Sequence, residues 1–315
     1  MRYIESINPG DRISDIYLVK NMQNALTKAG KPYISMTLQD KTGTLDAKIW
    51  EPGSMGINEF EALDYVDVMG DVTSFQGEKQ LSVKRLRVAN EGEYIPADYL
   101  PMTPYDIEEM YAELMQFVAS VRNPHLNALL NSFFGDPEFK KKFSFTSAAK
   151  GFHHAFVGGL LQHTLGVTRL CDDFSKRYEI LNRDLLVTAA MFHDIGKTEE
   201  LSPFPANDYT DDGQLLGHIS IGAMMVSERI HGMEDFPKIL ENELIHCILA
   251  HHGQLEYGSP KKPALAEAVA LNFADDVDAK MENLTESFAN VLPTDTGWQP
   301  YNKMIDSYIR RTSNE

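Results

Sequence analysis

The spacing of apolar residues changes part-way along this 315-residue chain, and the change separates two kinds of structure. Between residues 11 and 90, apolar and polar side chains alternate, as at Ile34, Met36 and Leu38. Alternation is typical of strands with one buried face. From Thr103 onward, apolar residues recur three and four positions apart, which is typical of amphipathic helices. The sequence therefore predicts a β domain followed by an all-α domain.

The β region contains about five short predicted strands separated by turn signals. One turn is predicted at residues 40–43, and a short helical insert near residues 58–63. This pattern favours a small closed barrel over a sandwich. Three prolines mark residues 91–104 as a linker, and Thr103-Pro104 predicts the start of the first helix. We divide the chain into a barrel at 1–92, a linker and helical connector at 93–150, a helical domain at 151–290 and a C-terminal tail at 291–315.

The net charge of −17 at first argues against a nucleic-acid partner. The acidic excess is uneven, because residues 1–95 carry 11 basic and 14 acidic side chains and the remainder carries 18 and 32. Cations bound in the second part would neutralise some of that acid. Two cysteines cannot form a disulfide framework, which favours a reducing compartment. We find no signal-peptide pattern and no apolar run of about 18 residues, so we expect a cytoplasmic protein without a membrane span.

Most of the ten histidines lie between residues 153 and 252, and several interrupt apolar stretches. Burying an unpaired polar group costs roughly 1–3 kcal/mol, so each needs a partner or a metal. One such histidine is more often a hydrogen-bonded core residue, but five polar sites in successive helices favour a metal centre. The five sites are His163, His193-Asp194, His218, His251-His252 and Asp275.

Imidazole and carboxylate groups together suit divalent manganese, iron, cobalt, nickel or zinc. Adjacent side chains diverge by about 100° on a helix, so His193 can serve one metal while Asp194 bridges to a second. Two metals about 3.5–4 Å apart can activate a water and hold the oxygens of a phosphoryl group. Gly196 predicts the end of that helix. Lys197 then offsets phosphate charge or, equally well from spacing alone, is solvated.

This series resembles the HD-domain metal-dependent phosphohydrolases over roughly residues 150–285, most specifically in the segments HDIGK and FADDVDA. The resemblance implies one metal held by His163, His193, Asp194 and Asp275. It implies a second metal held by Asp194, His218 and His251, with His252 as a further ligand or phosphate contact. Asp278 shares a helix face with Asp275 and is expected to support a ligand from behind.

The remaining histidines have weaker signals. His154 and His153 could protonate a leaving group or touch phosphate, and a structural histidine pair is the alternative. His125, His231 and His246 are interpreted as structural. His246 and its neighbour Cys247 lack the multi-ligand spacing of a zinc site.

The segment YISMTLQDKTGTLDAKIW is similar to nucleic-acid-binding barrels of the oligonucleotide/oligosaccharide-binding (OB) type. Such barrels stack the bases of single strands on aromatic side chains beside basic ones. The alternative is that Trp50 fills the barrel core and the basic side chains are solvated. The predicted contacts are Tyr33, Trp50, Phe75, Lys79, Lys84, Arg85 and Arg87.

The order of barrel, connector and HD domain resembles the YhaM family of bacterial 3′→5′ exoribonucleases over nearly the whole chain. The resemblance implies hydrolysis of single-stranded RNA, and also of single-stranded DNA, from a free 3′ end. It implies two divalent metal ions, with Mn2+ expected and Co2+, Fe2+ or Ni2+ compatible. The direction of digestion comes from the resemblance alone. Exposed faces of a helical domain would also suit a homo-oligomer.

Two other hypotheses remain at this point. An HD phosphohydrolase could act on small or cyclic nucleotides, but the segment HHGQLEYGSPKKP lacks the Gly-Tyr-Pro of cyclic-dinucleotide enzymes. A nucleic-acid-binding protein with an inactive HD domain is the third hypothesis, and the complete ligand series argues against it.

Overall fold

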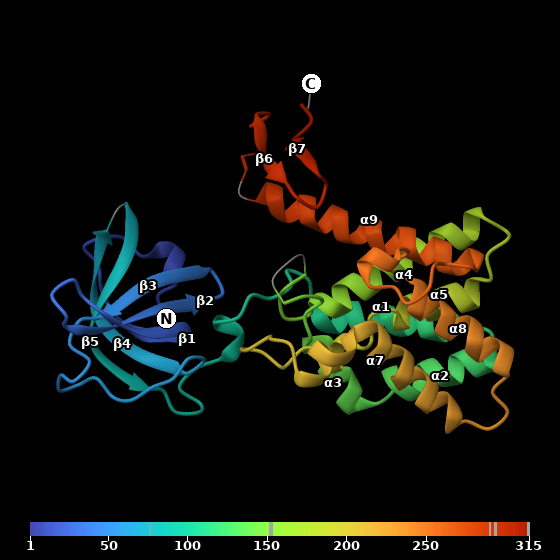
Figure 1. Ribbon diagram of the computed structural model, residues 1–315, viewed down its shortest axis with the longest axis horizontal. Coiled ribbons are helices and arrows are strands. Elements are labelled where there is room, and N and C mark those ends of the chain that lie inside the picture. The colour runs from blue at the N-terminus through green and yellow to red at the C-terminus, as the bar shows by residue number, and fades with distance from the viewer. Residues whose placement is uncertain (76, 151–153, 290, 293–294, 314–315) are drawn as a thin grey trace. The chain divides into compact units, whose positions relative to one another are not determined.

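The computed structural model of the chain describes residues 1–75, 77–150, 154–289, 291–292 and 295–313. It divides into two compact units, Met1–Met102 and Thr103–Glu315 (Figure 1). The first unit carries a closed five-stranded barrel and the second is mainly helical. The predicted order of an OB-type barrel followed by an all-α domain is confirmed.

The barrel consists of five strands in the order β1-β2-β3-β5-β4. Among these five strands as described, β3 and β5 are the pair that runs parallel, which is the arrangement of the five-stranded OB fold. The long strand β1 pairs with both β2 and β4, and a register shift between Val19 and Asn21 bends it around the closure. The strands are β1 (Arg12–Leu26), β2 (Pro32–Asp40), β3 (Gly43–Ile49), β4 (Tyr65–Phe75) and β5 (Glu78–Val88).

The alternating residues fill the barrel as predicted. Met36 and Leu38 on β2 are fully buried, and their neighbours along the strand face outward. The helical insert expected near residues 58–63 is wrong, because the segment between β3 and β4 has no helix. Asn58 donates its backbone N–H to the Leu86 carbonyl at 2.9 Å, so this segment forms backbone hydrogen bonds with β5 in place of those within a helix.

The predicted linker is ordered against the barrel. A short 3-10 helix, η2 (Pro96–Asp98), follows β5, as η1 (Ile4–Ser6) precedes β1. The ring of Tyr94 stacks on that of Tyr65 with centroids 3.8 Å apart, and Tyr99 packs edge-on against both. This aromatic cluster holds the linker on the first unit.

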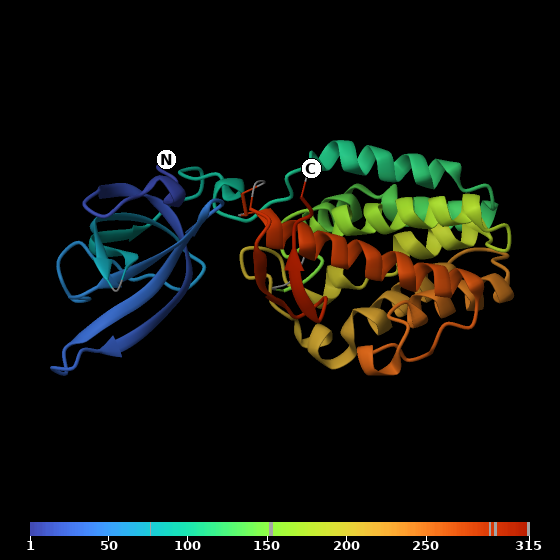
Figure 2. The same ribbon diagram turned by 90° about the horizontal axis from the view of Figure 1, so that it is seen from above.

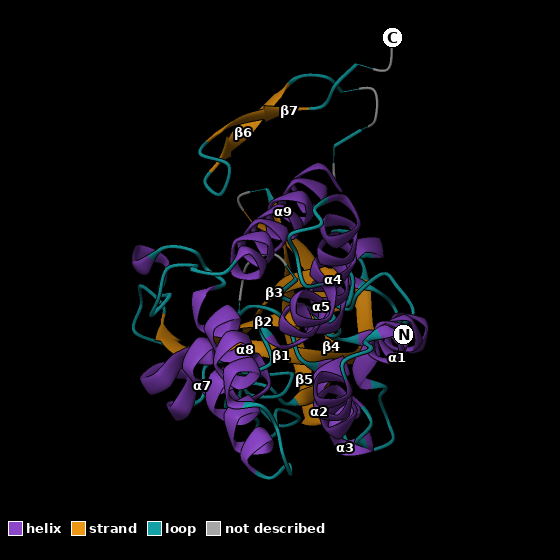
Figure 3. Cartoon of the chain, turned by 90° about the vertical axis from the view of Figure 1, so that its right-hand side faces the viewer, coloured by secondary structure: helices purple, strands orange, loops and turns teal. Residues whose placement is uncertain are grey.

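The second unit contains α-helices packed around one core, seen from two further sides in Figures 2 and 3. The connector helices α1 to α3 share that core with α4 and α5, since Leu114, Leu130 and Phe192 belong to one buried cluster. The helices are α1 (Ile107–Ser120), α2 (Pro124–Phe134), α3 (Pro137–Phe145), α4 (Gly159–Arg177), α5 (Arg183–Phe192), α6 (Lys197–Glu200), α7 (Asp211–His231), α8 (Lys238–Ala250), η3 (Leu255–Tyr257) and α9 (Ala266–Ala289).

The first helix begins later than the sequence suggested. Asp106 is the N-cap of α1, and its side chain accepts the backbone N–H of Glu109 at 2.9 Å. Thr103 instead bonds to Val157 through its backbone and to Gln162 through its hydroxyl. The Thr103 hydroxyl, which the local sequence pattern assigned to capping the helix, is therefore bonded to the distant residue Gln162 instead.

The segment expected to be a C-terminal tail contains a small antiparallel sheet of β6 (Trp298–Asn302) and β7 (Ser307–Arg310). The Asn302 amide donates to the side chain of Asn283 at 2.6 Å, which ties this sheet to α9. Within the described residues, no helix combines the length and apolarity needed to cross a membrane.

Candidate metal centre and nucleic-acid interface

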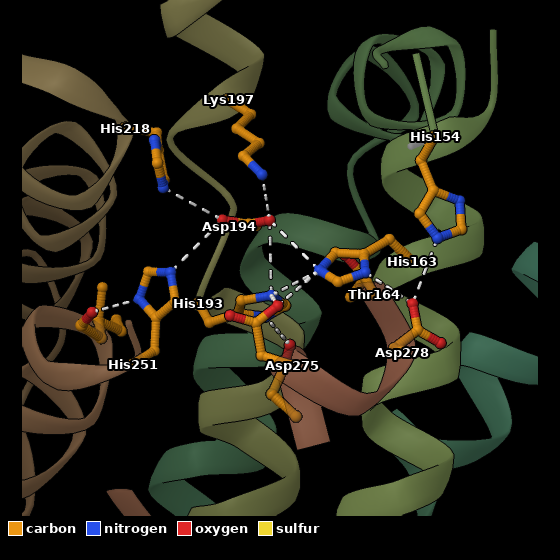
Figure 4. A network of polar contacts seen from close by, with 12 residues as sticks. His154, His163, Thr164, His193, Asp194, Lys197, His218, His251, Asp275 and Asp278 are labelled. Atoms are coloured by element: carbon orange, nitrogen blue, oxygen red, sulfur yellow. Dashed lines mark hydrogen bonds and ion pairs between the residues drawn. The ribbon is translucent and has the colours of Figure 1, made fainter. Parts of the chain in front are cut away.

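Five helical segments deliver polar side chains to one buried point, shown in Figure 4. The side chains come from α4, the turn after α5, the middle of α7, the end of α8 and α9. Most of these side chains are nearly inaccessible to solvent although they are polar, and their neighbours in sequence are apolar. They are the predicted ligands His163, His193, Asp194, His218, His251 and Asp275.

Asp194 lies at the centre, and its two carboxylate oxygens face different pairs of imidazoles. Its Oδ2 lies 3.5 Å from Nε2 of both His163 and His193. Its Oδ1 lies 3.4 Å from Nε2 of His218 and 3.6 Å from Nε2 of His251. A carboxylate placed in this way can bridge two cations, one on each side.

The Nδ1 atom of each imidazole already has an acceptor. His193 and His251 each face the backbone carbonyl three residues earlier at 2.7 Å. His163 faces Asp278 at 2.7 Å, and His218 faces Glu200 at 3.0 Å. An acceptor at Nδ1 assigns the proton of a neutral ring to that atom, so Nε2 presents its lone pair toward Asp194.

These donor atoms fit a metal better than they fit one another. The Nε2 atoms of His163 and His193 are 3.2 Å apart, and two facing lone pairs at that distance repel unless a positive charge lies between them. Asp194 Oδ1 and the Nε2 atoms of His218 and His251 are buried, and no hydrogen bond to them is found among the described residues. Buried acceptors of this kind call for a cation.

Among the described residues, potential ligand atoms within 4.8 Å of one another form three groups; one of them is His154, His163 and Asp278, and the other two lie on either side of Asp194. Of these two, one contains His163, His193 and Asp275, and the other contains His218, His251 and His252. We call these the His163 half and the His218 half of the centre, with Asp194 between them. Imidazole with carboxylate is a donor set for divalent transition metals.

Burial and charge determine the protonation of the centre. Burial lowers the pKa of His193 to about 4, so this ring is neutral at pH 7. Burial alone would also lower the pKa of His163, but hydrogen bonds to Asp275 and Asp278 outweigh it and raise that pKa to about 10. Without a cation, a proton on His163 thus supplies the positive charge that the surrounding acceptors require. A bound metal would replace that proton.

Lys197 belongs to the centre and is not a solvated lysine. Its Nζ lies 2.6 Å from Asp194 Oδ2, and its side chain is 15% exposed. Burial would raise the pKa of Asp194, but Lys197 and the imidazoles around it hold that pKa well below its usual range. The ammonium group is therefore placed beside the ligands with its charge retained.

The expectation that Gly196 ends a helix is wrong. Helix α5 already ends at Phe192, and Gly196 has ordinary right-handed backbone angles. A Cβ built on Gly196 would lie 2.0 Å from the backbone oxygen of His218 and 2.6 Å from the backbone N of Gly222. Glycine is needed here because α7 approaches the backbone so closely, which brings His218 up to Asp194.

The two other predicted catalytic histidines lie in different places. His154 is buried, with Nε2 3.3 Å from Asp278 Oδ2, so it contacts a residue behind His163 and not Asp194. The ring of His252 is half-buried, with its centroid 4.4 Å from that of His251. It therefore belongs to the His218 half, beside His251. His153 falls outside the described residues.

On the barrel, Tyr33 and Trp50 form a stacked pair. Their ring centroids are 5.2 Å apart, and Trp50 is 47% exposed, so it does not fill the core. Lys48, on β3 two residues before Trp50, faces away from the barrel core, and its Nζ lies 2.6 Å from the Ser35 hydroxyl. Phe75, at the end of β4, is 59% exposed.

Two of the four predicted basic residues of β5, Lys84 and Arg87, form ion pairs with acidic side chains. Lys84 forms an ion pair with Asp71, and Lys79 donates to a backbone carbonyl. Arg87 bonds at 2.8 Å to each of two carboxylates, those of Asp67 and Glu93. Arg85 pairs with Met69 of β4, and β5 also runs beside β3, the strand that leads into Trp50. The acidic partners of Lys84 and Arg87 thus reduce the positive charge that β5 presents.

Comparison with known proteins decides the family. Residues 160–280 match the family model described as HD domain. Over 287 residues, 90% of this chain, the sequence is 34% identical to the 3′-5′ exoribonuclease YhaM of Bacillus velezensis, of which 90% is covered. A protein of the same name from a Geobacillus species is 33% identical, with 87% covered. The chain belongs to the YhaM family.

The family predicted from the sequence is thereby confirmed for this chain. The part of the chain that matches the HD-domain model runs from α4 into α9 and contains all six predicted ligands. Among solved structures, this chain is similar to the second OB-fold domain of replication protein A from Methanococcus maripaludis. The alignment has 19% identity and a TM-score of 0.23, and covers 29% of this chain and 96% of that one.

Sequence reasoning missed two residues that support the ligands of this YhaM-family chain. Glu200 accepts a hydrogen bond from His218. Its sequence neighbour Glu199 is exposed to solvent, so two adjacent glutamates in the sequence indicate only a charged surface. Gly166 lies against Asp278, because a Cβ there would come within 2.0 Å of Asp278 Oδ1. Local sequence carries no signal for either contact.

Proposed function

We propose that this chain is a metal-dependent 3′→5′ exoribonuclease that hydrolyses single-stranded RNA to nucleotides. The observation that carries the proposal is the convergence of four imidazole Nε2 atoms on the two oxygens of Asp194. Membership of a family whose relatives are named 3′-5′ exoribonuclease supplies the substrate and the direction. Single-stranded DNA is the second substrate that we propose.

Two divalent cations, with manganese as the expected ion, form the cofactor in this proposal. His163, His193 and Asp275 would hold one with Asp194 Oδ2. His218 and His251 would hold the other with Asp194 Oδ1, with His252 within reach. Ions at these positions would supply the Lewis acidity that phosphodiester hydrolysis requires.

The residues around the ligands have distinct proposed roles. Lys197 places a buried ammonium beside the ligands, where it can offset phosphate charge. His252 is the more accessible of the two adjacent histidines, which suits a contact with phosphate or with a leaving oxygen. His154 contacts Asp278, so its role is to orient that carboxylate and through it His163.

The barrel is the proposed capture site for the single strand. Tyr33 and Trp50 offer a stacked, exposed aromatic surface, and each stacked base contributes about 1–3 kcal/mol in such sites. Phe75 is a further exposed ring. Lys79, Lys84, Arg85 and Arg87 would add a general attraction to phosphate, reduced by the acidic partners of Lys84 and Arg87.

A homo-oligomer remains part of the proposal. Four apolar side chains at four-residue spacing on α9 are exposed, which supports a self-association surface. They are Val269, Phe273, Val277 and Met281. Light scattering at micromolar concentration tests it, and a mass of one chain would contradict it.

The decisive experiment uses a 5′-labelled single-stranded RNA with manganese, compared with chelator. Adjacent aspartates provide a matched pair of variants, because Asp275 belongs to the His163 half and Asp276 forms an exposed ion pair with Lys280. We expect a ladder shortening from the 3′ end with the wild-type chain and with Asp276→Ala. Asp194→Ala and Asp275→Ala should lose more than about 100-fold in rate.

Three results would contradict the proposal. An intact RNA under every metal tested would do so, and turnover of mononucleotides or cyclic dinucleotides in place of RNA would identify a different HD phosphohydrolase. Stoichiometric RNA binding with no hydrolysis would identify a binding protein.

A further inference from the structure

Helix α7 is broken immediately before one of the ligands. Gly217 has φ 71° and ψ 152°, so the helix restarts at His218. In a continuous helix, the His218 backbone N–H would bond to the carbonyl of residue 214. Here that N–H donates to Glu200 Oε1 at 2.9 Å. The same oxygen lies 3.0 Å from Nδ1 of the His218 ring.

The Glu200 carboxylate is held firmly in this position. Its side chain is 10% exposed and belongs to the last residue of α6. The Glu200 carbonyl accepts the backbone N–H of Thr210 at 2.9 Å, and a Cβ on Gly213 would lie 2.3 Å from that same carbonyl oxygen. Backbone contacts on two sides therefore fix the residue that carries the carboxylate.

One oxygen of Glu200 accepts two hydrogen bonds, which hold both the ring and the backbone of His218. The bond to Nδ1 keeps the proton there and leaves the Nε2 lone pair facing Asp194 Oδ1, 3.4 Å away. The bond to the backbone N–H stabilises the start of the second part of α7, since a carboxylate favours a helix N-terminus.

The four rings that face Asp194, two in each half of the centre, follow one pattern. In each half one ring, His193 or His251, is held by a carbonyl of its own helix. The other ring, His163 or His218, is held by a carboxylate from a different element. A substitution cannot remove the carbonyls, but it can remove each carboxylate separately, so the two halves can be perturbed one at a time.

We propose that Glu200 is a positioning residue for the His218 half of the centre, and that the occupancy of this half depends on it while the His163 half does not. The inference rests on the proposed metal centre but not on RNA hydrolysis. Removing such a carboxylate partner typically weakens metal affinity by about 10–100-fold.

The test measures manganese bound per chain, and the affinity of each site, by titration calorimetry on the metal-stripped full-length chain. We expect two sites in the wild type. Glu200→Ala should keep one site at wild-type affinity and weaken the other by about 10–100-fold. Glu200→Gln should retain both sites much better, because its amide oxygen can accept both N–H groups. Glu199→Ala is the matched control, since the neighbouring side chain bonds to Lys142 at the surface.

Several outcomes would overturn the inference. They are two unchanged sites in Glu200→Ala, equal weakening of both sites in a folded variant, and a Glu200→Gln chain that binds as poorly as Glu200→Ala. Should Glu200→Ala fail to fold, Glu200→Leu fills the same space without an acceptor and is judged by the same results. A wild-type chain that binds fewer than two ions removes the premise. If the wild type shows the expected binding pattern but degrades no RNA, the proposed activity fails and the positioning role stands.

Discussion

The substitution Gly166→Ala isolates one contact behind the His163 half of the centre. Gly166 lies inside α4, where alanine is favoured over glycine by about 1 kcal/mol. The added Cβ would lie 2.0 Å from Asp278 Oδ1, more than 1 Å closer than any ordinary contact. The Asp278 side chain must therefore move, and it is the group that holds His163 Nδ1 at 2.7 Å.

The expected magnitudes follow from that displacement. A buried hydrogen bond to a charged group contributes about 1.5–3 kcal/mol, which exceeds the helix-propensity gain, so the metal-free variant should be less stable. Manganese affinity at the His163 half should fall about 10–100-fold, as for the loss of other carboxylates behind histidine ligands. Calorimetric titration with manganese and thermal unfolding measure the two effects.

A double-mutant cycle with Asp278→Ala decides whether the reasoning is correct. In the Asp278→Ala background the clash is absent, so Gly166→Ala should leave metal affinity unchanged and raise stability by up to about 1 kcal/mol. The sign of the stability change thus reverses between the two backgrounds. Equal losses in both backgrounds would refute the idea that Gly166 acts through Asp278.

Three further predictions concern other parts of the chain. Removal of metal should lower the midpoint of thermal unfolding, because ligand at 100 times its Kd stabilises by about 2.7 kcal/mol; an unchanged midpoint with chelator would contradict a structured metal centre. Trp50→Ala should weaken single-stranded RNA binding by about 1–3 kcal/mol in fluorescence anisotropy, and Lys84→Ala should weaken it less because Asp71 already pairs with that lysine; the reverse order would disprove the stacking surface. Burial would raise the pKa of Asp172, but Lys176 and Arg183 hold that pKa below its usual value. The ionised carboxylate therefore stabilises the fold above the unfolded pKa of about 3.9, and this contribution is lost as the pH falls. Asp172→Asn should flatten the acid side of the profile of stability against pH, and an unaltered profile would count against this ion pair.

The sequence by itself determined the two kinds of structure and the types of residue that meet at the centre. Alternation at Ile34, Met36 and Leu38 is a local property that only a half-buried strand satisfies, so the barrel strands could be predicted. Imidazoles and carboxylates inside apolar helices need a cation or a partner wherever those helices pack, so the ligand types could be predicted as well. The predictions near residues 58–63 and at Thr103 were wrong because these residues bond to distant parts of the chain. The backbone N–H of Asn58 bonds to Leu86, and the hydroxyl of Thr103 bonds to Gln162.

Only the tertiary structure decided which atoms face one another. The opposed pairs of imidazoles around Asp194, and the bond from His218 to Glu200, join segments that no periodicity connects. The close approach of α7 to Gly196 depends on how two helices pack, to within tenths of an ångström. The acidic partners of the β5 cations depend equally on which strands lie side by side. A sequence pattern reports the environment that each residue needs, whereas packing selects the partner that provides it.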